Sequence, residues 1–198
     1  MIITNEFEVA QPVDKVWRFF DNIPQVAACL PGAELTKDLG DDKYEGRVAI
    51  RMGPVRMQFT GTADIVERDN AKKHIVVNAA GADVKGRGQA AMVVGATLSA
   101  KGQHTRVAVN QDLQLSGAAA QYGRGMISDV SAILMRDFSA NMQNRIERLE
   151  RGESAESISA ASAGGSASGF GIAMRAAQLA LTRVFRRFFL PYRPVAAR

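Results

Sequence analysis

Residues 105–142 read "TRVAVNQDLQLSGAAAQYGRGMISDVSAILMRDFSANM", and this stretch places a strand directly before a long helix. Apolar residues alternate in residues 105–115, so one face of a predicted strand carries Val107, Val109, Leu113 and Leu115. We predict a helix over residues 119–150, whose apolar stripe holds Tyr122, Met126, Ile127, Val130, Ile133, Leu134 and Phe138. The opposite side of this helix is assigned Arg124, Ser128, Ser131, Arg136 and Ser139.

Upstream, the same reasoning predicts more strands and two short helices. Residues 2–9, "IITNEFEV", alternate like a half-buried strand, and "QPVDKVWRFF" then changes to helical spacing. A second short helix is predicted within "NIPQVAACLPG". From residue 33 to 116 strand-like runs are separated by short turns without intervening helices, which favours an antiparallel sheet. The sequence therefore predicts an α+β domain in which a curved sheet wraps a long C-terminal helix and leaves an apolar cavity.

Composition limits the classes of protein that remain. The chain has 198 residues, which suits one domain with an appendage, and 46% of them are apolar. No window approaches eighteen consecutive apolar residues, and the N-terminus does not resemble a secretory signal. The one cysteine, Cys29, lies between Ala28 and Leu30 and is interpreted as a small buried apolar side chain in a reducing compartment.

The net charge of +5 is concentrated at the end of the chain. Residues 1–152 contain 19 basic and 18 acidic residues, whereas residues 170–198 contain six arginines and no acid. Residues 152–169, "GESAESISAASAGGSASG", have the composition of a flexible linker. We therefore divide the chain into a domain (1–151), a linker (152–169) and a basic tail (170–198). The domain lacks the broad excess of basic residues expected of a nucleic-acid binder, so no nucleic-acid partner is predicted.

The tail has the pattern of a basic amphipathic helix lying in a membrane interface. On a helix, its apolar and basic side chains separate to opposite sides, and Pro191 ends the pattern. The predicted membrane-binding residues are Met174, Leu181, Val184, Phe185, Phe188, Phe189, Arg175, Arg183, Arg186 and Arg187. Anionic lipids attract such arginines, so we expect a peripheral protein on an anionic membrane surface. Docking into a partner's groove or onto the domain's own cavity mouth remains an alternative.

Four stretches together resemble the carbon monoxide dehydrogenase G-subunit family of the START-like (Bet v 1-like) superfamily. They are "VAACLPGAEL" (26–35), "GPVRMQFTGTADI" (53–65), "GADVKGRGQAAM" (81–92) and "AQYGRGMISDVSAILMRDFSANM" (120–142). The resemblance implies a helix-grip fold with about seven strands and a hydrophobic cavity. It also implies an accessory role in recruiting a molybdenum hydroxylase of the carbon monoxide dehydrogenase type to the inner face of the cytoplasmic membrane. The family pattern supplies no catalytic residue.

The candidate cavity lining comes from two strands and the long helix: Met57, Phe59, Val107, Val109, Tyr122, Met126, Val130 and Leu134. The same residues would also serve as ordinary core. Two histidines and one cysteine do not make a metal site, and we predict neither a metal nor a bound cofactor. The expected ligand is a hydrophobic molecule such as an isoprenoid quinone or another lipid.

The hypothesis is therefore a non-catalytic accessory protein. One alternative is a START-like enzyme resembling a cyclase or aromatase, for which Asp137, Asn141 and Tyr122 are the polar candidates. The favoured interpretation of Asp137 and Asn141 is purely structural, as two residues hydrogen-bonded to each other. A second alternative is an assembly chaperone of the hydroxylase.

Overall fold

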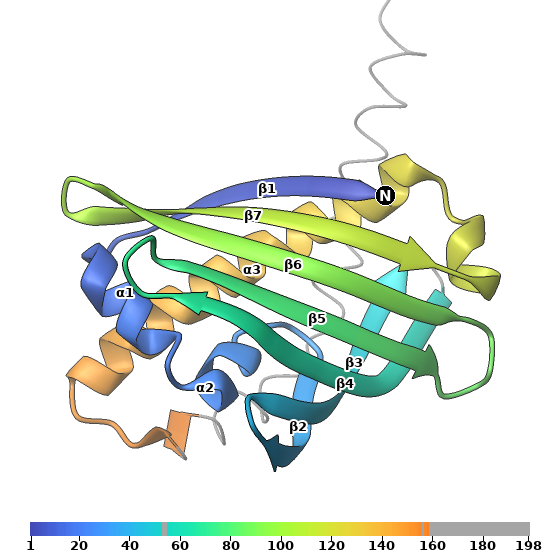
Figure 1. The fold of residues 1–198 in the computed structure, drawn as a ribbon, viewed down its shortest axis with the longest axis horizontal. Coiled ribbons are helices and arrows are strands. Elements are labelled where there is room, and N and C mark those ends of the chain that lie inside the picture. The colour runs from blue at the N-terminus through green and yellow to red at the C-terminus, as the bar shows by residue number, and fades with distance from the viewer. Residues whose placement is uncertain (53–54, 156, 159–198) are drawn as a thin grey trace, which may run out of the picture. The chain divides into compact units, whose positions relative to one another are not determined.

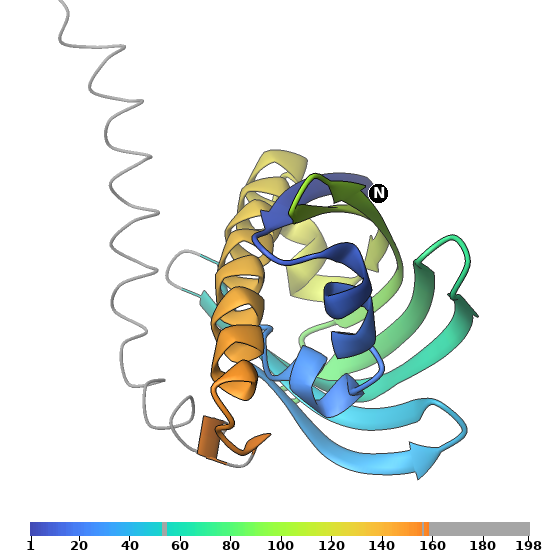
Figure 2. The same cartoon turned by 90° about the vertical axis from the view of Figure 1, so that its left-hand side faces the viewer.

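The computed structural model describes residues 1–52, 55–155 and 157–158, and these form a curved sheet with helices on its concave side (Figures 1 and 2). The linker beyond residue 158 and the whole tail, with every predicted membrane-binding residue, lie outside the described residues. The elements in chain order are β1 (Ile2–Val9), α1 (Val13–Phe19), α2 (Ile23–Ala27), β2 (Ala33–Gly40), β3 (Lys43–Met52), β4 (Val55–Asp69), β5 (His74–Asp83), β6 (Gln89–Lys101), β7 (His104–Leu115), the 3-10 helix η1 (Gly117–Gln121) and α3 (Arg124–Glu150).

The seven strands form one antiparallel sheet in the order β1-β7-β6-β5-β4-β3-β2. Strands β2 to β7 follow one another as a meander, and β1 pairs with β7 to give the sheet its other edge. In Figure 1, α1 and α2 lie at one end of the sheet, while η1 and the start of α3 lie at the other. The predicted architecture of a curved antiparallel sheet with a long C-terminal helix is confirmed.

A row of glycines allows the sheet to bend sharply across β3, β4 and β5. Gly46 pairs with Gly61, and Gly61 pairs with Gly81. A Cβ atom added to Gly61 would lie 1.9 Å from the carbonyl oxygen of Ala80, which is far inside van der Waals contact. Because only glycine permits this approach of two backbones, Gly61 is required for the curvature of the sheet.

The long helix begins later than predicted. The prediction of helix from residue 119 was wrong at its start, because residues 117–121 form a 3-10 turn and α3 begins at Arg124. The reason is tertiary: the Ala118 amide donates to the Arg87 carbonyl at 2.7 Å, which fixes this segment against the turn between β5 and β6. Tyr122 therefore lies in extended backbone before α3 and not on the helix itself.

Helix α3 covers the open edge of β1. The Ser139 hydroxyl donates to the Glu8 carbonyl at 3.1 Å, and the Ala10 amide donates to Gln143 Oε1 at 2.8 Å. The rings of Phe7 and Phe138 meet edge to face with centroids 5.9 Å apart. Two backbone groups at the C-terminal end of this edge therefore bond to the helix.

The end of α3 is capped by Gly152, whose φ of +81° is the left-handed conformation common after helices. Glu153 then forms ion pairs with Arg148 and Arg151. Within the stretch assigned to the linker, Ile158 is buried. No helix among the described residues is long and apolar enough to cross a bilayer.

Candidate functional site

Two clusters of buried side chains fill opposite ends of the concave side. The larger one joins α1, β5, β6, β7 and the end of α3, and its buried members include Trp17, Phe20, Leu98, Val107, Val109, Met142 and Ile146. The smaller one is built on Met57, Phe59 and Ala119, with Tyr122 and Val130 packed against it. Of the eight predicted cavity residues, Val107 and Val109 lie in the larger cluster and Met57, Phe59, Tyr122 and Val130 in the smaller one, while Met126 and Leu134 belong to neither.

The predicted cavity residues differ in how deeply they are buried. Met57 is fully buried, and Phe59 is 7% exposed beside it. Leu134 is half-buried on α3, whereas Met126 is 44% exposed at the start of that helix.

Next to the smaller cluster, against which Ala90 and Leu115 pack, the concave face of the sheet is apolar and only half-buried. Two neighbouring cross-strand rows share this property: Gly46, Gly61, Gly81, Ala90 and Leu115 in one, and Tyr44, Ala63, Ala79, Met92 and Leu113 in the other. Six of these ten residues are glycine or alanine, so few side-chain atoms project into the space that they face. We call these two rows the small-residue rows. They are the part of the concave face that an apolar ligand would contact.

A polar group borders the small-residue rows. Gln111 is 6% exposed and points inward from β7, between the buried Val109 and the half-buried Leu113. Its Oε1 accepts from the Ser131 hydroxyl at 3.3 Å, and that hydroxyl oxygen accepts from Asn5 Nδ2 at 2.9 Å. Gln111 Nε2 is buried and has no partner among the described residues.

Sequence reasoning missed this polar group. The prediction that Ser131 lies on the outer side of the helix was wrong, because the side chain is 8% exposed and faces β1 and β7. The signal for Gln111 was present in the alternation of β7, where residue 111 falls on the same face as Val107 and Val109. An inward polar residue in such a pattern needs a partner from another element, and here α3 supplies it.

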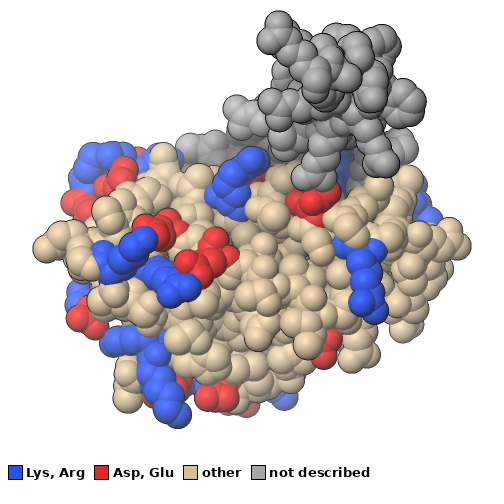
Figure 3. Space-filling view, turned by 90° about the horizontal axis from the view of Figure 1, so that it is seen from above, with Lys and Arg blue, Asp and Glu red and all other residues tan. Residues whose placement is uncertain are grey.

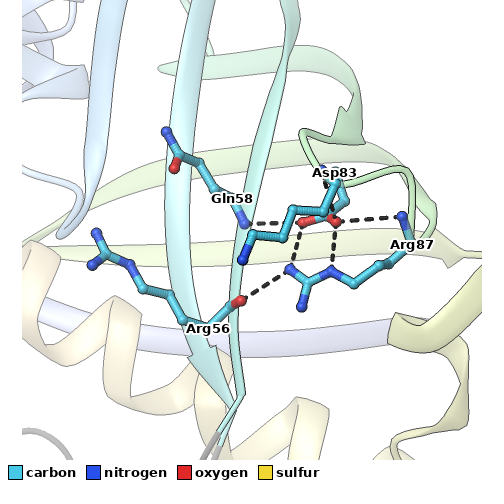
Figure 4. Close-up of polar contacts among 5 residues, drawn as sticks. Arg56, Gln58, Asp83 and Arg87 are labelled. Atoms are coloured by element: carbon cyan, nitrogen blue, oxygen red, sulfur yellow. Dashed lines mark hydrogen bonds and ion pairs between the residues drawn. The ribbon is translucent and has the colours of Figure 1, made fainter.

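A buried ion pair fixes the turn between β5 and β6 at one end of the sheet (Figure 4). The Asp83 carboxylate accepts from Arg87 Nε at 2.7 Å and from Arg87 Nη2 at 2.9 Å, and also from the backbone amides of Gln58, Lys85 and Arg87. Arg87 Nη2 further donates to the Arg56 carbonyl at 3.0 Å. These hydrogen bonds, led by those from Arg87, hold the pKa of Asp83 well below its usual range.

Uncompensated basic side chains surround this turn. Arg51 and Arg56 face each other across β3 and β4, and both are exposed. Like charges directly opposite in a sheet repel, so this pair costs stability unless an anion lies nearby. Neither arginine, nor the exposed Lys85, forms an ion pair with a described residue. We call Arg51, Arg56 and Lys85 the basic rim.

Elsewhere the surface charge is mixed. On the face drawn in Figure 3, basic and acidic side chains are interspersed. Ion pairs such as Arg106–Glu6 and Lys101–Glu8 join neighbouring strands on the outside of the sheet. An open groove of about 570 Å³ follows the seam between β1 and α3, lined by residues 6–8, 10, 136, 139, 140 and 143. This groove does not involve the predicted cavity residues.

The polar residues nominated for catalysis do not converge. Asp137 pairs with its neighbour Arg136, and Asn141 donates to the Cys29 carbonyl at 2.9 Å. Each is hydrogen-bonded, but to a different partner, so the interpretation of the two as a mutual pair was wrong. Tyr122 packs in the smaller cluster, at the other end of the domain from Cys29. Among residues 1–52 and 55–155, no three His, Cys, Asp or Glu side chains gather in a way that suits a metal ion.

Cys29 is a buried structural residue, as the sequence predicted. Its side chain is inaccessible, and its thiol donates to the Gln25 carbonyl at 3.2 Å. Burial raises the pKa of Cys29 to about 12, so the reactive thiolate is scarce at neutral pH. Gln25 also accepts at Oε1 from the buried Arg145 at 3.0 Å.

Solved structures share the fold at low sequence identity. A conserved protein from Geobacillus kaustophilus is 20% identical, with a TM-score of 0.66 over 75% of this chain and 96% of that one. The Zhui aromatase/cyclase from Streptomyces sp. R1128 is 16% identical, with a TM-score of 0.54 over 75% and 94% of the two chains. TTHA0849 from Thermus thermophilus is 12% identical, with a TM-score of 0.54 over 75% and 99%. No curated protein matches the sequence.

The match to a family model agrees with the motifs in the sequence. The model for the carbon monoxide dehydrogenase G-subunit (CoxG) aligns with residues 6–147, from β1 almost to the end of α3. The matched region thus contains nearly the whole concave face, both clusters and the Asp83–Arg87 pair. With its START-like helix-grip fold, the chain belongs to the carbon monoxide dehydrogenase G-subunit (CoxG) family.

Proposed function

We propose that this protein is a non-catalytic accessory subunit. It recruits a molybdenum hydroxylase of the carbon monoxide dehydrogenase type to the inner face of the cytoplasmic membrane, and it binds a hydrophobic ligand such as an isoprenoid quinone on its concave face. The observation that carries the proposal is the half-buried apolar surface of the small-residue rows, which continues from the smaller cluster across the concave face. Contiguous apolar surface of this kind on a concave face is typical of ligand-binding grooves.

The quinone follows from the chemistry of the partner. A hydroxylase that oxidises its substrate must pass electrons to an acceptor, and a soluble enzyme does not reach a quinone dissolved in a bilayer. A carrier with an apolar cavity that docks on the membrane would connect the two. Its apolar lining excludes water and contacts a prenylated ring through dispersion and burial of apolar area.

Two basic features of the chain support contact with an anionic membrane. The tail contributes six arginines without an acid and the apolar spacing of an interfacial helix. The basic rim contributes Arg51, Arg56 and Lys85, exposed next to the turn between β5 and β6. Each basic group near an anionic leaflet adds about 1 kcal/mol to binding.

The catalytic alternative has less support. A cyclase or aromatase would need polar groups that converge on the ligand, whereas Asp137 and Asn141 bond to Arg136 and to the Cys29 carbonyl. A chaperone for the hydroxylase would bind protein in place of a small molecule. It would co-purify with the apo-enzyme and carry no stoichiometric lipid.

Two measurements on the full-length protein test the proposal. Mass spectrometry of a solvent extract from protein made in a quinone-producing host should find a stoichiometric isoprenoid quinone. Sedimentation with anionic vesicles should carry the partner hydroxylase down only when this protein is present. The matched control replaces Arg183, Arg186 and Arg187 by Glu, which should weaken vesicle binding at least about 100-fold. An empty protein, or equal sedimentation of the hydroxylase without it, would refute the corresponding half of the proposal.

A further inference from the structure

The unpartnered amide of Gln111 is the feature of the domain that most needs an explanation. A buried donor without an acceptor costs the free energy of its lost hydration, so native proteins nearly always satisfy such groups. Gln111 Nε2 is buried and unpartnered among the described residues, although the side chain is 6% exposed and held in place by its other polar atom. An acceptor on a bound molecule would satisfy it.

The hydrogen bonds around Gln111 determine what kind of partner it requires. Asn5 Nδ2 donates to the Ser131 oxygen, which leaves the Ser131 hydroxyl proton to donate to Gln111 Oε1. In this series of hydrogen bonds each residue donates to the next, from Asn5 to Ser131 to Gln111. The series ends at Gln111 Nε2, which can only donate. The partner must therefore present an acceptor oxygen.

The surroundings indicate that this acceptor is uncharged. The cross-strand row of Gln111 and the two small-residue rows contain no lysine or arginine. The inward Arg68, which lies opposite Ile75 near the end of β4, is engaged by the Phe20 carbonyl and by Asp21. The carboxylate of Asp83, in the neighbouring row opposite Phe59, is already paired with Arg87. A carboxylate or phosphate ligand would be buried here without a counter-charge, which is costly. A neutral carbonyl oxygen carries no such penalty.

Gln111 also lies where a ligand ring would reach it. Its neighbours across the strands are Ile3 on β1 and Val94 on β6, and the next inward residue on β7 is Leu113 of the small-residue rows. Val94 packs against the larger cluster and Leu113 is half-buried, so the amide lies at the border between the packed core and the half-buried small-residue rows. The ring of a bound molecule lying on glycine and alanine would bring an oxygen at its rim against this amide.

We propose that Gln111, oriented by Ser131 and Asn5, is a polar anchor that donates a hydrogen bond to a ring carbonyl of a bound quinone. This inference rests on the proposed function and specifies how the ligand is recognised. Ser131 and Asn5 are positioning residues, since they act on the ligand only through Gln111. The anchor selects a ring with carbonyl oxygens over hydrocarbons of the same size.

The test compares two probes that differ in their carbonyl groups, 2-decyl-1,4-benzoquinone and decylbenzene, by calorimetric titration of the full-length protein. Gln111→Leu should weaken binding of the quinone about 3- to 10-fold, the value of one neutral hydrogen bond, and change binding of decylbenzene less than about twofold. Gln114→Leu is the matched control, because Gln114 lies on the same strand but is exposed on the opposite face. This control should bind both probes like the wild type.

Thermal melts separate recognition from folding. Unliganded Gln111→Leu should melt close to the temperature of the wild type, because the substitution removes a buried unpaired donor but also removes the acceptor of the Ser131 hydroxyl. If leucine disturbs the fold, Gln111→Met keeps nearly the same volume and repeats the comparison.

Each outcome has one meaning. Unchanged quinone affinity in Gln111→Leu, or an equal loss of affinity for both probes, would overturn the anchor and leave a site that binds by apolar contact alone, with water as the partner of the amide. Failure of the wild type to bind either probe would overturn the proposed ligand function itself.

Discussion

Substitution of Gly61 by alanine should destabilise the domain more than any other single added methyl group in the sheet. The added Cβ would start 1.9 Å from the Ala80 carbonyl oxygen and 2.5 Å from the Gly81 Cα, both of them backbone atoms. Contacts below about 3 Å are not tolerated, so one strand must move by about 1 Å at the point of strongest bending. No flexible side chain is available to absorb the shift.

The magnitude follows from what this movement disrupts. Overpacking that moves backbone costs about 1–3 kcal/mol, and loss of a ladder hydrogen bond adds about 1 kcal/mol. We expect about 3 kcal/mol for Gly61→Ala. At Gly81 the nearest atom is 3.0 Å away, and the expected cost is below about 1 kcal/mol. At Gly125 on α3 nothing lies within 4 Å, and alanine should stabilise by about 0.5–1 kcal/mol through helix propensity.

Urea denaturation of the three variants, followed by fluorescence of the single tryptophan, Trp17, measures these free energies of unfolding. Trp17 suits the assay because it is buried in the larger cluster. The order of stability should be Gly125→Ala, wild type, Gly81→Ala and then Gly61→Ala. A Gly61→Ala protein within about 0.5 kcal/mol of wild type would refute the reasoning that close backbone approach sets the bend.

Three further predictions concern individual side chains. Arg87 lowers the pKa of Asp83 in the folded state, so the ion pair stabilises the fold at pH values above the unfolded pKa of Asp, near 3.9. As the pH falls below that value, Asp83 loses this stabilising effect. The stability advantage of wild type over Asp83→Asn should therefore shrink between about pH 4 and pH 2 in acid denaturation curves. The Cys29 thiol should resist Ellman's reagent at pH 8 and react fully in guanidinium, and stoichiometric labelling of native protein within minutes would contradict its burial. Met142→Ala should cost about 2–5 kcal/mol, whereas Met126→Ala, at an exposed position, should stay within about 0.5 kcal/mol in the same urea assay.

Much of the fold could be predicted because the spacing of apolar residues within a short segment already distinguishes a strand from a helix. The strand predicted over residues 2–9 has the observed bounds of β1, and the helical spacing after Pro12 identifies α1. Strand β2 was not singled out, since its pattern is interrupted by charged residues and two register shifts. The start of α3 was missed because a hydrogen bond from Ala118 to a distant turn outweighs the helical pattern.

The candidate site was less predictable, because its properties depend on which elements face each other. Met57 and Val107 are both inward and apolar, yet the bend of the sheet puts them in different clusters. Ser131 looks like a surface residue in a helical pattern until Asn5 and Gln111 are brought to it from two other strands. Similarly, the spacing of Asp83 and Arg87 does not reveal a buried pair unless the turn between β5 and β6 is already folded against β4.

The way in which α3 bonds to β1 has a consequence for how the protein behaves at high concentration. Ser139 and Gln143 bond to the Glu8 carbonyl and the Ala10 amide, two backbone groups at the C-terminal end of this edge. The other border, β2, carries Lys37 and Asp38 at its two register shifts, and such irregular charged strands are poor templates for pairing. Growth of the sheet by added strands is thereby hindered at both borders, so we expect the domain to resist fibril formation when it is concentrated.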